Sequence, residues 1–171
     1  LQGIFWFEDE YDINTIRENF NYYEPKTVHE SSLSPSIHSI LASKIGRVDK
    51  AYEFYMRSAR LDLDDYNKEV NEGLHITSMA GTWMAVVEGF GGKRIKNGIL
   101  SFHPVIPDEW SNYAFKILYR QRILKLTVSK QEVKIENLSG EPVNVMLYDK
   151  TYAVAHDSPV ILPYYPKNNT L

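Results

Sequence analysis

The spacing of apolar residues changes near residue 90 of the chain. Before that point apolar residues recur every three or four positions, as on one face of an α-helix. Beyond it they alternate with polar residues, as in half-buried β-strands. The glycine-rich stretch Gly89-Phe90-Gly91-Gly92 lies at the change. The pattern therefore predicts a helical first half and a β-sheet second half.

Three segments of the first half have amphipathic helical spacing. We expect one helix over 13–20 with Asp12 as its cap, and one that Ser34 caps, with Pro35 in its first turn and Gly46 after its end. A third covers 48–59, with a stripe of apolar and small residues opposite polar ones: Val48, Ala51, Tyr52, Tyr55, Met56 and Ala59.

A fourth helical segment, 76–87, is apolar or small on every side, which predicts a buried helix capped by Thr77 or Ser78. Gly81 inside it costs about 1 kcal/mol relative to alanine, which indicates close packing or a ligand at that point.

The second half contains short strand-like segments separated by turn residues. Alternation is clear over 112–119, 124–129, 133–136 and 143–147, and Asn97-Gly98 is a strong hairpin signal. Such spacing predicts an antiparallel β-sandwich. From residue 163 to the end we expect a loose tail.

Composition and charge exclude several kinds of protein. The chain has 171 residues, of which 43% are hydrophobic and 24% charged, and its net charge is −3. These values are typical of a globular domain without a basic field for nucleic acid or anionic membranes. Cysteine is absent, which excludes disulfides and zinc–sulfur sites and suits a reducing cytosol. We therefore expect a cytoplasmic protein that binds neither nucleic acid nor membrane.

The loop over 22–35 is the first candidate for a binding site. It gathers His29, Glu30, Ser31, Ser32 and Ser34 just before a helix start, where hydroxyls and backbone N–H groups suit a bound anion. The alternative is local: Ser34 caps the helix, and Ser31 and Ser32 make turn hydrogen bonds.

A second candidate is His75, which precedes the helix expected over 76–87 and can donate a hydrogen bond to phosphate or a sugar hydroxyl. The alternative is a core histidine bonded to backbone.

The acidic run over 62–67 lacks the glycine and glutamate of a calcium-binding loop. We interpret it as a connection whose carboxylates cap helices or pair with Arg57 and Arg60.

Several long blocks resemble the C-terminal region of glycoside hydrolase family 65. They run over 22–25, 28–34, 61–67 and 73–83, and include His29-Glu30-Ser31-Ser32 and Gly73-Leu74-His75-Ile76-Thr77-Ser78. The resemblance is strong from residue 1 to about Trp110 and weaker beyond it.

The resemblance implies an α+β multi-domain fragment. Residues 1–91 would supply the C-terminal helices of an (α/α)6 barrel, and residues 92–171 a jelly-roll-like antiparallel β-sandwich. It also implies an inverting phosphorylase that needs no cofactor or metal: inorganic phosphate attacks an α-linked glucose disaccharide, maltose favoured, and releases β-glucose 1-phosphate. By motif match, the phosphate-binding residues would be Ser31, Ser32 and His75, with Thr77 and Gly81 as further contributors.

The family's general-acid glutamate and a sugar-binding Lys-Gln pair have no counterpart in this sequence; in the family they precede this region. We therefore expect a fragment, inactive alone, from an enzyme that is a homodimer at full length. The alternatives are action on trehalose, kojibiose or nigerose, a hydrolase of the same family, and a non-catalytic carbohydrate-binding module built on the sandwich.

Overall fold

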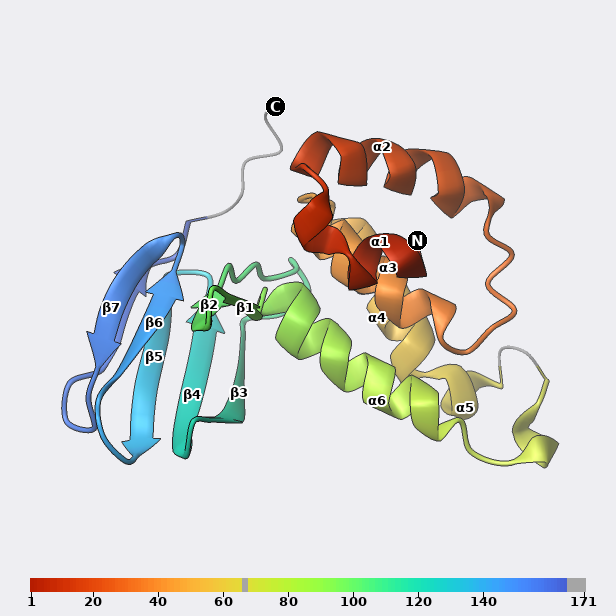
Figure 1. Cartoon of the computed structure of the whole chain (residues 1–171). Helices are drawn as coiled ribbons and strands as arrows, with labels where there is room; N and C mark the ends of the chain where they lie inside the picture. Colours follow the sequence, from red (N-terminus) through yellow and green to blue (C-terminus); the bar gives the residue numbers. More distant parts are fainter. Residues whose placement is uncertain (66–67, 166–171) are drawn as a thin grey trace. The chain divides into compact units, whose positions relative to one another are not determined.

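A computed structural model of the chain describes residues 1–65 and 68–165 (Figure 1). Its contacts divide the chain into two compact units, residues 1–89 and 90–171. The expected boundary at residues 91 and 92 comes from a family resemblance and stays a prediction. The first unit is helical and the second consists of two sheets, as the change in spacing predicts.

Within the described residues, the helical part of the chain contains six α-helices and four helical segments of other types. The α-helices are α1 (Gln2–Trp6), α2 (Ile13–Tyr23), α3 (Ser34–Lys44), α4 (Val48–Ala59), α5 (Leu61–Asp64) and α6 (Ile76–Met84). Three of the other segments are 3-10 helices, η1 (Glu8–Glu10), η2 (Glu24–Lys26) and η3 (Val70–Glu72), and the fourth is the π-helical segment η4 (Ala85–Phe90), which continues α6.

The helix ends confirm some of the expected caps and correct others. The Asp12 carboxylate accepts hydrogen bonds from the backbone N–H groups of Asn14 and Thr15, as expected. Gly46 follows α3 with φ at +85°, which a glycine adopts readily. The expected Ser34 cap is wrong: Leu33 holds the cap position, and no side chain caps the helix.

Two further expectations about the helices are wrong. On α4 the buried residues are Ala51, Phe54 and Ser58, so the interior face is rotated from the expected stripe. Helix α6 is not buried on all sides and has no side-chain cap. It packs against α3 and α4 through Ser78 and Gly81, while large apolar residues on its other side stay exposed: Ile76, Met79 and Trp83.

The second unit is a sandwich of two four-stranded sheets. One sheet has the order β1-β2-β6-β7 and the other β3-β4-β5-β8. The strands are β1 (Arg94–Lys96), β2 (Ile99–Phe102), β3 (Asn112–Tyr119), β4 (Arg122–Ser129), β5 (Glu132–Ser139), β6 (Val143–Leu147), β7 (Lys150–Val154) and β8 (Val160–Pro163).

The predicted sandwich is confirmed, with one addition. Among the described strands every pair is antiparallel except β2 with β6, whose parallel pairing is allowed by the long connection through β3, β4 and β5 of the other sheet. Asn97 and Gly98 turn the first hairpin with φ at +50° and +74°, the combination their dipeptide predicts. Strands β7 and β8 were not predicted. Residues 166–171 of the expected tail lie outside the described part of the chain.

Every second residue along the central strands points into the sandwich, and these side chains from both sheets form its core. The ring centroids of Phe102 on β2 and Phe115 on β3 lie 6.2 Å apart across the sandwich. The buried Tyr113 hydroxyl donates to the backbone oxygens of Phe90 and Val105, which fixes the segment that enters the sheets. Burial raises the pKa of Tyr113, so this hydroxyl remains a donor.

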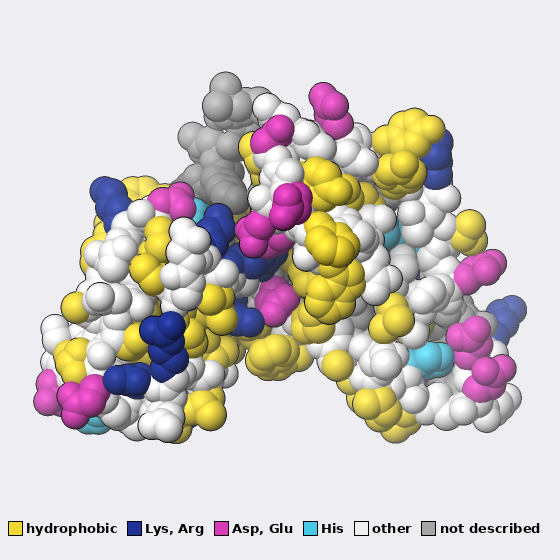
Figure 2. Space-filling model, in the orientation of Figure 1, with side chains coloured by type: hydrophobic (Ala, Val, Ile, Leu, Met, Phe, Trp, Pro, Cys, Tyr) yellow, Lys and Arg dark blue, Asp and Glu magenta, His cyan; other side chains and the backbone are white. Residues whose placement is uncertain are grey.

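The helical unit leaves many large apolar side chains at its surface. Figure 2 shows hydrophobic side chains over its visible face. The exposed apolar residues of this unit include Trp6, Phe7, Leu63, Leu74 and Trp83, each more than half exposed. No helix within the described residues combines the length and apolarity needed to cross a membrane.

Candidate functional site

The loop over 27–33 connects η2 to α3 and carries both predicted phosphate-binding serines. Ser31 makes local turn bonds: its hydroxyl accepts a hydrogen bond from the Leu33 N–H at 3.3 Å, and its backbone oxygen accepts one from Ser34 at 3.2 Å. Ser31 is exposed, whereas Ser32 is half-buried. The local turn interpretation therefore holds for Ser31, whose side chain also remains open to solvent.

His29 anchors the base of this loop. Its backbone has φ at +59°, a conformation that costs a non-glycine residue free energy and needs compensating contacts. The Nδ1 atom lies 2.6 Å from the Ser34 hydroxyl, and Arg57 donates to the His29 backbone oxygen at 2.9 Å. The imidazole also packs on Phe54, with ring centroids 4.9 Å apart. Ser34 therefore holds the loop instead of capping α3.

A second histidine, His38, lies beside His29 inside the helical unit. Their ring centroids are 4.5 Å apart, and His38 Nδ1 donates to the Ser34 backbone oxygen at 2.8 Å. Desolvation lowers the pKa of His38 to about 4 and also lowers that of His29, with the nearby Arg57 charge as a further cause. The pair is therefore uncharged at neutral pH and belongs to the packing of the loop.

The other predicted histidine, His75, precedes α6 and is held by a carboxylate. Asp62 Oδ1 lies 2.5 Å from His75 Nδ1, and Asp62 Oδ2 accepts the His75 backbone N–H at 3.0 Å. On the other side of the ring, Glu69 Oε2 lies 3.4 Å from Nε2. The hydrogen bond that His75 donates to Asp62 is the main cause of a raised His75 pKa. His75 is therefore half-buried and ion-paired, not a core histidine bonded to backbone.

The two other predicted contributors on α6 differ in exposure. Thr77 is exposed in the first turn of α6. Gly81 is buried, and a Cβ atom there would lie 2.5 Å from the Ser36 hydroxyl oxygen of α3. The close approach of the two helices therefore accounts for the glycine, which is the packing alternative offered by the sequence.

The acidic run after α4 forms a structured connection. Asp62 binds His75, and Asp64 pairs with Arg60 at 2.6 Å, one of the two arginine pairings expected. Tyr66 and Asn67, the end of this run, lie outside the described residues. Among the residues that are described, no group of three or more metal-ligating side chains occurs.

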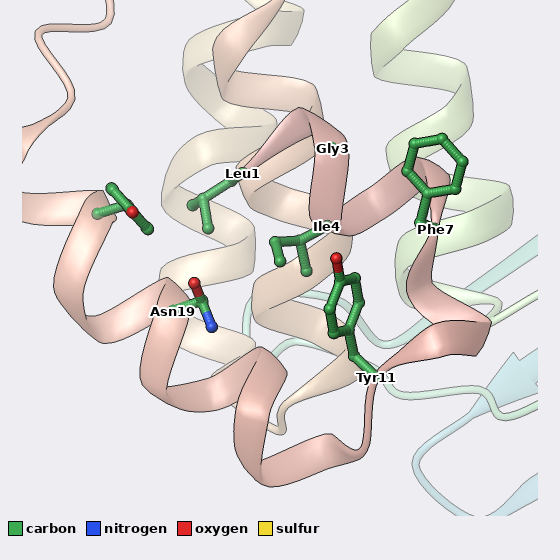
Figure 3. A pocket seen from close by; sticks show the side chains of 7 residues that line it. Leu1, Gly3, Ile4, Phe7, Tyr11 and Asn19 are labelled. Carbon is green, nitrogen blue, oxygen red and sulfur yellow. The ribbon is translucent and has the colours of Figure 1, made fainter.

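A hollow of about 290 Å³ lies between α1 and α2 and contains no residue of the predicted phosphate site. Its lining includes the side chains of Leu1, Ile4, Phe7, Tyr11 and Asn19, which Figure 3 labels. The remaining lining residues are Gly3 and Tyr23. No side chain in this lining carries a charge, so the hollow does not suit an anion.

The structure orders the predicted residues into two groups. Ser31 and Ser32 lie on the loop before α3, while His75, Thr77 and Gly81 lie on or just before α6, whose middle contacts the first turn of α3 at Ser36. Their joint action on phosphate stays a prediction. The sequence reasoning did not identify Asp62 as the partner of His75, because a separation of 13 positions matches no helical or strand period.

Comparisons with known proteins point to one family for both units. The family description "Glycosyl hydrolase family 65 central catalytic domain" matches residues 1–84, and "Glycosyl hydrolase family 65, C-terminal domain" matches residues 94–154.

Individual relatives agree with these matches. Maltose phosphorylase of Bacillus subtilis (strain 168) is 51% identical over 150 residues, which cover 88% of this chain and 20% of that protein. An α,α-trehalose phosphorylase of Geobacillus stearothermophilus is 44% identical over 160 residues, 94% of this chain and 21% of that protein.

A solved structure supports the same grouping. It comes from a human-microbiome protein that carries the provisional name kojibiose phosphorylase, with a TM-score of 0.88 and 42% identity over 94% of this chain and 21% of that one. The chain thus spans about one fifth of the length of these relatives.

Proposed function

The chain belongs to glycosyl hydrolase family 65, and we propose from this membership that it is the C-terminal part of an inverting disaccharide phosphorylase. The full-length enzyme would cleave an α-linked glucose disaccharide with inorganic phosphate and release β-glucose 1-phosphate and glucose. Maltose is the favoured substrate. The observation that carries this choice is the 51% identity to a maltose phosphorylase.

Phosphorolysis is favoured over hydrolysis on two grounds. The relatives reported above all carry the name phosphorylase. The residues also agree with this choice: an inverting hydrolase needs a carboxylate base to activate water, whereas phosphate is itself the nucleophile. The exposed hydroxyl of Ser31 and the half-buried hydroxyl of Ser32 can donate hydrogen bonds to a phosphate ion, and neither is a base for water.

In the proposed reaction a phosphate oxygen attacks the anomeric carbon from the face opposite the leaving sugar. The new C–O bond forms as the glycosidic bond breaks, so the configuration inverts. A general acid in another part of the enzyme protonates the departing sugar oxygen. Ser31, Ser32 and His75 would hold the phosphate, with Thr77 and Gly81 in lesser roles. No cofactor or metal takes part.

Three features of the whole protein remain part of the proposal. The chain alone is inactive because it supplies the phosphate side without the proton donor. The full-length enzyme is a homodimer, and it is cytoplasmic. Trehalose is the second candidate substrate, supported by the 44% identity to a trehalose phosphorylase. A stand-alone carbohydrate-binding module is disfavoured, because the helical unit matches a catalytic domain.

The test is an assay of the full-length enzyme with maltose, trehalose and kojibiose, each with and without phosphate. We expect phosphate-dependent release of β-glucose 1-phosphate, fastest from maltose. Cleavage that proceeds equally well without phosphate would contradict phosphorolysis. A faster reaction with trehalose or kojibiose would change the substrate and leave the reaction class intact.

A further inference from the structure

We propose that Asp62 is a positioning residue that fixes the imidazole of His75 so that its Nε2 atom faces the bound phosphate. This inference rests on the proposed phosphate role of His75. It adds a residue that touches no substrate and acts through the histidine alone.

The geometry that supports this role is a two-point contact. One carboxylate oxygen of Asp62 faces His75 Nδ1 at 2.5 Å, and the other accepts the backbone N–H of the same residue at 3.0 Å. Binding ring and backbone together restricts rotation of the His75 side chain. It also requires that Nδ1 carry a proton, because an ionised carboxylate can only accept. The remaining nitrogen, Nε2, is then the only ring atom that can contact a solute.

Burial adds to this restriction. The Asp62 side chain is 14% exposed and that of His75 is 22% exposed, so the pair is partly shielded from water. Asp64, two residues along the same short helix, is 33% exposed and pairs with Arg60 instead. The two carboxylates of α5 thus have different partners: Asp62 contacts His75, and Asp64 contacts Arg60.

The protonation of His75 also suits a contact with an anion. The Asp62 hydrogen bond raises the pKa of His75, and the charges of Asp62 and Glu69 add to the rise. Raising this pKa extends the pH range in which the ring is an imidazolium, which donates a charge-assisted hydrogen bond from Nε2. Glu69 lies 3.4 Å from Nε2, and its side chain is 40% exposed. Phosphate would displace this carboxylate toward solvent.

A purely structural role for Asp62 would give different experimental results from a positioning role. If Asp62 merely joined α5 to the start of α6, its loss would lower stability without changing the pH dependence of phosphate use. If it positions His75, its loss must alter phosphate affinity and the pH at which that affinity disappears. Phosphate binding through an imidazolium is lost as the pH rises through the pKa of His75. Without the Asp62 charge this loss must occur at lower pH.

The experiment compares Asp62→Asn, Asp62→Glu, His75→Ala and Asp64→Asn in the full-length enzyme, with kcat and the phosphate KM measured across the pH range. For Asp62→Asn we expect the phosphate KM to rise about tenfold, as for loss of a group that orients a ligand-binding histidine. We expect kcat at saturating phosphate to stay within about twofold, and the alkaline limb to move to lower pH. Asp62→Glu, which keeps the charge, should restore part of the affinity. The matched control Asp64→Asn should leave phosphate KM unchanged.

The outcomes separate this inference from the function on which it rests. If His75→Ala raises the phosphate KM while Asp62→Asn leaves both KM and the alkaline limb unchanged, Asp62 is not a positioning residue and the phosphate role of His75 stands. If His75→Ala has no effect on the phosphate KM, that role itself fails. Should Asp62→Asn not fold, the same readings on Asp62→Glu decide: an unchanged KM and pH profile after moving the carboxylate by one methylene would overturn the inference.

Discussion

The helical unit and the sandwich use their interiors in different ways. The sandwich interior is mostly aliphatic, with Leu124, Leu126 and Ile135 almost fully buried and Asn137 among its few buried polar side chains. The helical unit buries a histidine and a series of serines between its helices: Ser36, His38, Ser39, Ser43, Ser58 and Ser78. At the same time it leaves Trp6, Ile76 and Trp83 at the surface.

Small polar residues allow the helices to approach closely and to exchange hydrogen bonds. Ser58 on α4 and Ser78 on α6 bond to one another and to backbone, and Ser39 donates to the Ala51 backbone oxygen. These hydrogen bonds and the close helix contacts add to the burial of apolar residues such as Phe20, Ile40 and Leu41 in the same unit. We therefore expect the stability of the sandwich to fall most when a core side chain is made smaller. The stability of the helical unit should fall most when a side chain is enlarged between its helices or a buried histidine is protonated.

The largest expected effect is the loss of volume in the sandwich. Leu124→Ala removes a side chain that is 1% exposed and should lower the free energy of unfolding of this unit by about 2–5 kcal/mol. The matched change Leu118→Ala, at a position 75% exposed on the neighbouring strand, should stay within about 0.5 kcal/mol. Denaturant unfolding followed by Trp110 fluorescence, with Trp6 and Trp83 replaced by Phe, measures both. Equal losses of unfolding free energy in the two variants would contradict the view that the sandwich depends on its buried volume.

Acid should destabilise the helical unit more than the sandwich. His38 has a pKa near 4 in the folded chain against 6.5 when exposed, so below pH 6.5 the unfolded state binds the extra proton. Stability present above pH 6.5 is then lost as the pH falls toward 4, by up to about 3 kcal/mol. His29 shifts in the same direction.

Hydrogen exchange between pH 7 and pH 4, corrected for the intrinsic rates, measures this loss. Protection of α3 and α4 should fall while that of β4 and β5 is retained. The exposed His156→Gln serves as the control and should not alter the profile. Parallel loss in both units would show that the buried histidines are not the cause.

The smallest expected effect tests added volume in the helical unit. In Gly81→Ala the new methyl group meets Ser36 at 2.5 Å, so α3 and α6 must separate, at a cost of about 1–3 kcal/mol. Gly3→Ala, where a Cβ meets nothing within 4 Å, should be neutral or slightly stabilising. Thermal unfolding followed by circular dichroism compares the two. A melting temperature unchanged by Gly81→Ala would mean that the helices accommodate the methyl group freely.

Sequence reasoning succeeded where local chemistry decides the outcome. The Asp12 cap, the Gly46 helix end and the Asn97-Gly98 hairpin follow from preferences of a few neighbouring residues. Strand β3 has the expected bounds, because its alternation is regular over eight residues. The failures were the Ser34 cap, the buried face of α4 and the burial of α6, each of which depends on residues distant in the sequence.

The candidate site divides in the same way. The motifs drew attention to Ser31, Ser32 and His75, and the hydroxyl-rich loop and the histidine at a helix start are readable from single short segments. The partners of these residues are not. Arg57 at the His29 backbone and Asp62 at the His75 ring come from other elements, 28 and 13 residues away.

The sequence by itself determined the family, the change from a helical half to a β-sheet half, and the residue types available to bind an anion. All of these follow from local spacing and motif identity, which need no knowledge of how the chain folds back on itself. Only the tertiary structure decided that Ser34 holds His29, that Gly81 is required by Ser36, and that Asp62 orients His75. Such pairings depend on where helices cross, and small differences in packing set those crossings without leaving a periodic trace in the sequence.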